Sequence, residues 1–162
     1  MKSEIIKVFG NRLRVRVCGI CIDEQGILLV KHHALGPKGV FWSPPGGGLE
    51  FGESAEESLK REFLEETGLQ TEVTRFLFTH EFLQEPLHAI ELFFEVRKTG
   101  GTLKTGSDPE MKDENQIIQE VKYVSPEDLK TFDPATLHNI FRLVAAPKEV
   151  VNLEGYILFK PS

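Results

Sequence analysis

Several short stretches of the chain are rich in apolar and β-branched residues and are separated by turn residues, a pattern typical of β-strands. Gln25-Gly26 separates the first two stretches, which predicts a hairpin, and Glu85-Pro86 marks a turn between two later ones. The predicted strands cover residues 13–22, 27–31, 71–82, 88–98 and 117–124, with a short edge strand at 156–159.

The pattern changes to a helical one at residues 55–67. Ser54 and Glu57 form a capping box at its start, because each side chain can bond the backbone N–H of the other. Gly68 stands where a helix C-cap belongs. These end signals predict a helix that begins and stops within this short segment.

The remaining segments complete the prediction of the fold. A further helix is expected after Ser125, with Pro126 at its first position, and residues 134–145 have helical apolar spacing. Residues 34–53 hold so many Gly and Pro residues that they predict a shaped loop, and the polar residues 99–116 predict a mobile loop. Strands interleaved with a few helices indicate an α/β fold, a sandwich around a mixed β-sheet.

Size and charge limit the possible functions. The chain has 162 residues, so we expect residues 1–162 to form one domain. Its net charge of -6 makes nucleic-acid polymers poor partners, and an acidic protein that acts on phosphates would need cations to bridge the like charges. No apolar run approaches the roughly 20 residues that span a bilayer, and no secretory signal is visible, so we expect a cytoplasmic protein. A homodimer is left open.

Cys18 and Cys21 have the C-x-x-C spacing of redox and zinc sites. Both fall in a predicted strand, where residues three apart point to opposite faces of the sheet. We therefore interpret them as packing cysteines in a reducing compartment.

The helix at residues 55–67 carries three glutamates near its buried side. At about 100° per residue, Glu66 lies in the same arc as the apolar residues, Glu62 lies beside that arc, and Glu65 lies roughly 60° farther round. Acidic helix faces are usually just solvated, but partly buried carboxylates of like charge cost several kcal/mol unless they are paired or bind a cation. Mg2+ is commonly held by a few carboxylates plus substrate phosphates, which makes these glutamates candidate metal ligands.

The segment GGLEFGESAEESLKREFLEETGL resembles the Nudix box. That pattern is a glycine, five residues, a glutamate, seven residues, Arg-Glu, an apolar residue, any residue, Glu-Glu, any residue, a glycine and an apolar residue. The chain matches it without departure, at Gly47, Glu53, Arg61, Glu62, Phe63, Glu65, Glu66, Gly68 and Leu69.

The resemblance implies the sandwich fold of the Nudix family and hydrolysis of the diphosphate linkage in a nucleoside diphosphate derivative, such as a nucleoside triphosphate, ADP-ribose or a nucleotide sugar. It implies Mg2+ as cofactor, with Mn2+ as a substitute. The implied ligands are Glu62, Glu65 and Glu66, with a main-chain carbonyl around Gly46 or Gly47. Arg61 and Glu53 are implied as supporting residues of the catalytic site.

Within the family the general base varies. Glu62 is one candidate, and Glu114 and Glu120, expected in the loop before the strand at 117–124, are the others, either as base or as ligand. Glutamates in loops are more often merely solvated.

Candidates for substrate binding are Arg16, Trp42, Gly47 and Gly48. Arg16 could meet phosphates, although a solvated strand face explains it equally well. Trp42 could stack on a base, although aromatic residues there more often close the core. The alternative function is a non-catalytic Nudix-like module that binds or senses a nucleotide, whose usual sign is a broken box.

Overall fold

The computed structural model describes residues 2–111 and 116–161. Its strands are β1 (Arg12–Ile20), β2 (Ile22–Asp23), β3 (Gly26–His33), β4 (Val40–Ser43), β5 (Gly46–Gly48), β6 (Leu69–Gln84), β7 (Leu87–Gly101), β8 (Ile118–Val124) and β9 (Tyr156–Phe159). Its helices are α1 (Lys2–Phe9), α2 (Ala55–Thr67), α3 (Pro126–Leu129) and the 3-10 helices η2 (Pro134–Thr136), η3 (Asn139–Arg142) and η4 (Pro147–Asn152).

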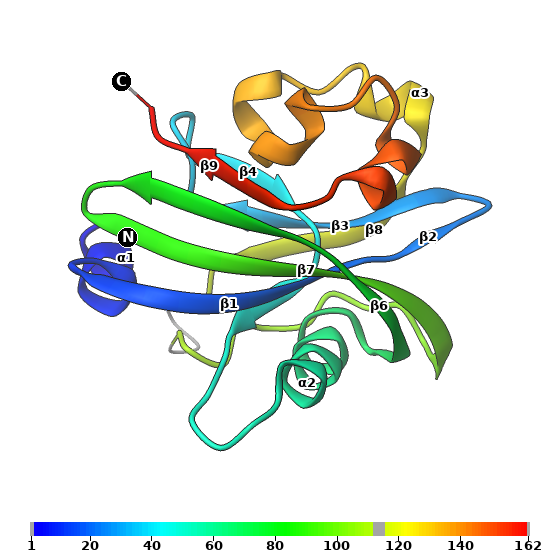
Figure 1. The fold of residues 1–162 in the computed structure, drawn as a ribbon, viewed down its shortest axis with the longest axis horizontal. Coiled ribbons are helices and arrows are strands. Elements are labelled where there is room, and N and C mark those ends of the chain that lie inside the picture. The colour runs from blue at the N-terminus through cyan, green and yellow to red at the C-terminus, as the bar shows by residue number, and fades with distance from the viewer. Residues whose placement is uncertain (1, 112–115, 162) are drawn as a thin grey trace.

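The strands form two sheets between α2 and the C-terminal 3-10 helices (Figure 1). One sheet has the order β5-β1-β7-β6-β9, with parallel pairs β1–β7 and β6–β9 and antiparallel pairs elsewhere. In the other sheet β3 pairs with β2, β4 and β8, all antiparallel. The predicted α/β sandwich with a mixed sheet is therefore confirmed.

Two cores lie on the opposite faces of the strands. Val17 and Leu28 pack under α2, whereas Ile20 and Leu29 belong to the core beneath the C-terminal helices. Neighbouring residues of a strand point to opposite faces, which is why each strand supplies both cores. Cys18 lies in the C-terminal core and Cys21 in the α2 core, both as buried free thiols. The packing interpretation of the two cysteines is confirmed.

The predicted hairpin between residues 13–22 and 27–31 is wrong for most of its length. Only Ile22–Asp23 pairs with β3, because the chain leaves the first sheet after β1, which pairs with β5 and β7. Apolar alternation shows which residues are buried, but it does not show which strands pair.

Two other segments differ from expectation. Residues 34–53 contain the short strands β4 and β5. Residues 134–145 form two 3-10 helices instead of a continuous helix, because His138 between them has a non-helical backbone (φ -56°, ψ 142°) and its N–H donates to the carbonyl of Trp42 at 2.9 Å. A tertiary contact has overridden the local spacing here. The N-terminal helix α1 was not predicted.

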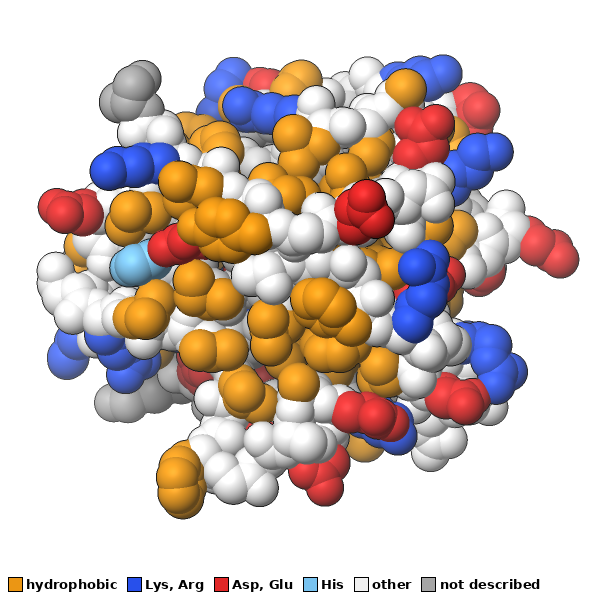
Figure 2. Space-filling view, in the orientation of Figure 1, with side chains coloured by type: hydrophobic (Ala, Val, Ile, Leu, Met, Phe, Trp, Pro, Cys, Tyr) orange, Lys and Arg blue, Asp and Glu red, His pale blue; other side chains and the backbone are white. Residues whose placement is uncertain are grey.

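Part of the five-stranded sheet is not covered by a helix. On the face that carries α2, the region beyond this helix exposes side chains of β1, β6 and β9, namely Leu13, Val15, Phe76, Tyr156 and Leu158. Figure 2 shows apolar side chains gathered across this side of the molecule. None of the described helices is long and apolar enough to cross a membrane.

Candidate active site

Helix α2 places its glutamates at different depths. Its capping box is present, because Ser54 Oγ accepts from the N–H of Glu57 at 3.2 Å and the Glu57 carboxylate accepts from the N–H of Ser54 at 2.8 Å. Glu62 and Glu66 are buried on the core side, at 3% and 2% exposure, whereas Glu65 is half-buried. The helical arc expected from the sequence agrees with these positions.

The glycine strand β5 lies directly against these carboxylates. The N–H of Gly46 donates to Glu66 Oε2 at 3.0 Å. A Cβ placed on Gly47 would lie 2.4 to 2.5 Å from the carboxyl atoms of Glu62, so a larger residue at this position would displace that carboxylate. The glycines of the box therefore allow the backbone to approach the helix, and the main chain of β5 is close enough to share a ligand with the glutamates.

Arg61 connects the acidic residues on the exposed side of α2. Its guanidinium donates to Glu53 at 2.8 and 3.0 Å, to Glu62 at 3.0 Å and to Glu65 at 3.1 Å. The carboxylate of Glu57 is held by the capping box instead. Arg61 thus orients three carboxylates at once, as a supporting residue would.

The two buried glutamates have unusual acidity. Burial raises the pKa of Glu62 to about 7, although the Arg61 guanidinium opposes the shift. Burial and the neighbouring Glu62 raise the pKa of Glu66 well above its usual value. Such carboxylates take up either protons or a cation, and a divalent cation with oxygen ligands satisfies both groups together. The donor set therefore fits a hard divalent metal.

The segment after β7 brings further carboxylates to the site. The N–H groups of Lys104, Gly106 and Ser107 donate to carbonyls of the last turn of α2, at 2.8 to 3.2 Å. This docking places Asp108 close enough to raise the pKa values of Glu62 and Glu66, and burial raises the pKa of Asp108 itself. Glu110 pairs with Arg14 at 2.7 Å beside Gly48.

Asp108 and Glu110 were missed by sequence reasoning. The available signal was the pair of acidic residues flanking Pro109 in the segment that was interpreted as a mobile loop. Glu114 lies outside the described residues. Glu120 is not in a loop but in β8, where its carboxylate pairs with Lys122 at 3.1 Å. It alternates with Val121, which packs in the α2 core, so it points away from α2.

The candidate substrate-binding residues have different surroundings. Trp42 is buried in the C-terminal core, with Phe132 at 5.2 Å between ring centroids and the Lys122 ammonium at 5.0 Å. It packs in the core, which was the alternative to base stacking. Arg16 lies between Gly48 of β5 and Glu91 of β7, and its side chain is partly exposed.

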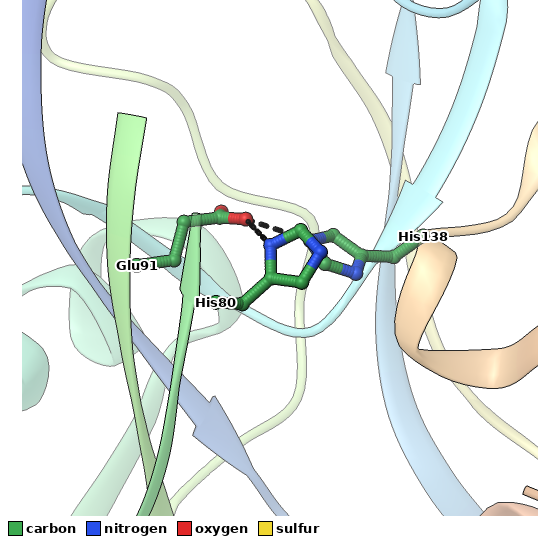
Figure 3. Close-up of side chains that lie close together, drawn as sticks. All are labelled: His80, Glu91 and His138. Carbon is green, nitrogen blue, oxygen red and sulfur yellow. Dashed lines mark hydrogen bonds and ion pairs between the residues drawn. The ribbon is translucent and has the colours of Figure 1, made fainter. Parts of the chain in front are cut away.

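A second cluster lies in the core beneath the C-terminal helices. His80, Glu91 and His138 converge there, as Figure 3 shows, with their ligand-type atoms within 4.8 Å of one another. On distance alone this cluster could hold a metal ion. The sequence signal for it was a glutamate in the middle of the apolar run Ile90 to Phe94.

Comparison with known proteins agrees with this geometry. The NUDIX domain family model matches residues 12–144. The nucleoside triphosphatase NudI of Escherichia coli O139:H28 is 32% identical over 160 residues, covering 90% of this chain and 99% of the relative.

Solved structures show the same fold. A NUDIX hydrolase from Nitrosomonas europaea superposes with a TM-score of 0.67 at 17% identity, covering 87% of each chain. A MutT protein from Methanosarcina mazei Go1 gives 0.63 at 22% identity, covering 82% of this chain and 89% of the other. An ADP-ribose pyrophosphatase from Streptococcus suis superposes with a TM-score of 0.60 at 18% identity, covering 88% of this chain and 98% of the other.

The family match and the relative at 32% identity define the class of protein, a hydrolase of acid anhydrides. The chain belongs to the Nudix family and is a Nudix pyrophosphohydrolase. Enzymes of this family generally use divalent metals and act on small nucleotide substrates.

Proposed function

We propose that this protein hydrolyses the diphosphate linkage of a nucleoside diphosphate derivative and depends on Mg2+, or on Mn2+ in its place. The observation that carries the proposal is the burial of Glu62 and Glu66, one helical turn apart, against the glycine strand. Two like charges so placed destabilise the free protein unless a cation or protons join them. A divalent cation is the partner that a diphosphate substrate also requires.

In this proposal, Glu62, Glu65 and Glu66 hold the metal together with a main-chain carbonyl of Gly46 or Gly47. Bound there, Mg2+ would neutralise the diphosphate and lower the pKa of the attacking water. Arg61 and Glu53 keep the carboxylates oriented, consistent with the hydrogen bonds of Arg61 to Glu53, Glu62 and Glu65.

We assign the general base to Asp108, with Glu62 as the alternative. The elevated pKa of Asp108 and its position beside the glutamates support this role, because a base works best when its pKa approaches the working pH. Glu110 is tied to Arg14 and is the weaker candidate.

A nucleoside triphosphate is the substrate class to test first, because the relative at 32% identity bears the name nucleoside triphosphatase. ADP-ribose and nucleotide sugars follow. Arg16, Gly47 and Gly48 are proposed to contact the substrate. A cytoplasmic location stays a prediction, and a homodimer stays open.

Glu66→Gln tests the site. We expect turnover of any diphosphate substrate to fall by roughly a hundredfold or more, because the variant loses a metal-ligating charge while the amide can still accept the Gly46 N–H. The assay is phosphate or nucleotide release from a panel of triphosphates, ADP-ribose, dinucleoside polyphosphates and nucleotide sugars, with Mg2+, with Mn2+ and with EDTA.

Glu56→Gln is the matched control, because Glu56 lies on the same helix and pairs only with the exposed Lys60 among the described residues. Unchanged turnover in Glu66→Gln would refute the assigned site. Tight nucleotide binding by the wild type without hydrolysis of any panel member would favour the non-catalytic binding module.

A further inference from the structure

The cluster of His80, Glu91 and His138 is built around one carboxylate oxygen. His80 Nδ1 lies 3.0 Å and His138 Nε2 lies 2.9 Å from the same Oε1 of Glu91 (Figure 3). The residues come from β6, β7 and the N-cap position before η3, and their exposures are 0%, 3% and 4%. Glu91 is therefore a buried carboxylate with two imidazole partners.

The hydrogen bonds around the imidazoles argue against a metal in this cluster. The N–H of Ile140 donates to His138 Nδ1 at 3.3 Å, so the proton of the neutral ring lies on Nε2, the atom that faces Glu91. That atom then donates to the carboxylate and has no lone pair for a metal. His80 Nε2 is buried and has no partner among the described residues, whereas a metal-bound histidine normally donates its second N–H to an acceptor.

The cluster is better explained as the support of an ionised carboxylate. Burial opposes ionisation of Glu91, but its histidine partners and Arg16 outweigh burial and hold the pKa of the carboxyl well below its usual value. Burial lowers the pKa of His138 against the attraction of Glu91, and in either protonation state its Nε2 carries the N–H that donates to Glu91. The Glu91 carboxylate is therefore negatively charged and can form an ion pair with a third residue.

That third partner is Arg16. Glu91 Oε2, the oxygen that the histidines leave free, faces β1 and lies 3.5 Å from Arg16 Nη1 and 3.6 Å from Cys18 Sγ. Glu91 is the only ion-pair partner of Arg16 within the described part of the chain, and the Nε of Arg16 is buried without an acceptor there.

Arg16 also reaches the acidic site. It is opposite Gly48 in the β1–β5 register, and its charge partly opposes the rise in the pKa values of Glu66 and Asp108. Its side chain remains 25% exposed, while Glu91 behind it is 4% exposed. The guanidinium is thus held by Glu91 on its buried side, while a quarter of the side chain remains exposed and open to a ligand.

We propose that Glu91 is a positioning residue, which His80 and His138 hold in place so that it orients Arg16 to bind a phosphate oxygen of the substrate. This inference rests on the proposed diphosphate hydrolysis. The inference also adds the C-terminal segment to the site. His138, which precedes η3, contacts Glu91 of β7, and Glu91 in turn contacts Arg16.

The test is a double-mutant cycle of Glu91→Gln and Arg16→Gln in the full chain, with thermal unfolding recorded for each variant. With Mg2+ and a diphosphate substrate, we expect each single variant to raise KM roughly tenfold or more and to change kcat much less, because ground-state phosphate binding is lost. We expect the double variant to be no worse than Arg16→Gln, since the two residues act through one contact.

Glu95→Gln is the matched control, because Glu95 lies on the same strand and pairs with an arginine, Arg75, at 2.6 Å outside the cluster. It should leave KM unchanged. A merely structural role of Glu91 would instead lower stability and leave KM unchanged. That result, or additive effects of the two substitutions, would overturn the inference.

Histidine variants keep the test decisive if Glu91→Gln does not fold. His138→Gln retains an N–H donor near the position of Nε2 and should keep KM close to that of the wild type, whereas His138→Leu should raise it. Equal KM values in these two variants would contradict the proposal. If Glu66→Gln loses turnover but Glu91→Gln keeps a normal KM, this inference is wrong and the proposed function stands. If the wild type hydrolyses no substrate, the proposed function and this inference are both wrong.

Discussion

At the residue scale, the buried glutamates Glu66 and Glu91 have pKa values shifted in opposite directions. Glu66 accepts one backbone N–H and faces another carboxylate, so its pKa is raised, whereas Glu91 faces two imidazoles and a guanidinium, so its pKa is lowered. A carboxylate with too few donors gains most from a metal ion, and one with several donors needs none. This difference supports a metal at α2 and a hydrogen-bonded network at Glu91.

The loop carboxylate provides a prediction at the same scale. We expect Asp108→Asn to lower kcat by roughly a hundredfold, the usual minimum for loss of a general base. Glu120→Gln should leave kcat unchanged, because this side chain points away from α2 and pairs with Lys122. Steady-state kinetics of the two variants with Mg2+ decide the matter, and equal activities would remove Asp108 as the base.

At the element scale, local end caps determine the length of α2, and packing against the core determines which side chains it buries. Its caps fix where it begins and ends, and Leu59 and Phe63, both fully buried, fix which side faces the core. That orientation buries Glu62 and Glu66 as a consequence. The segment after β7 then covers the C-terminal carbonyls of the helix and brings Asp108 with it.

The cap of α2 can be tested directly. Ser54→Ala removes the acceptor of the Glu57 N–H and should lower the free energy of unfolding by about 1 kcal/mol. Because the core still holds the helix, kcat at saturating Mg2+ should change little. Urea denaturation measures the loss, with Ser107→Ala as a control, since Ser107 contributes its backbone N–H to the contact with α2. A stability equal to the wild type would show that the Ser54 side chain contributes nothing to the cap.

At the scale of the whole molecule, the acidic site couples stability to pH and to metal. The pKa of Glu62 is about 7 in the folded protein against an ordinary value of 4.5. An acid whose pKa is raised by folding stabilises the protein fully below its ordinary pKa, and this contribution is lost as the pH rises through 7. Glu66 acts in the same direction.

We therefore expect Mg2+ to raise the unfolding temperature, and to raise it more at about pH 8 than at about pH 5, where protons compete for the carboxylates. Differential scanning calorimetry with Mg2+ and with EDTA measures the shift. The double variant Glu62→Gln/Glu66→Gln should lose both the metal response and its dependence on pH. A metal response of equal size in that variant would place the ion elsewhere.

The sequence by itself determined the local and chemical features. Periodicity and end signals predicted α2, its caps and most strands, because these depend on neighbouring residues. The fixed spacing of the box named the glutamates and Arg61, and the arc of the helix placed Glu62 and Glu66 near the core, as found.

Only the tertiary structure decided which distant segments meet. It brought Asp108 to α2, placed Glu120 on the opposite face, divided residues 134–145 around His138, and joined Glu91 to Arg16 across neighbouring strands. The physical reason is that strand pairing and loop docking depend on contacts between residues far apart in the chain, which local periodicity does not encode.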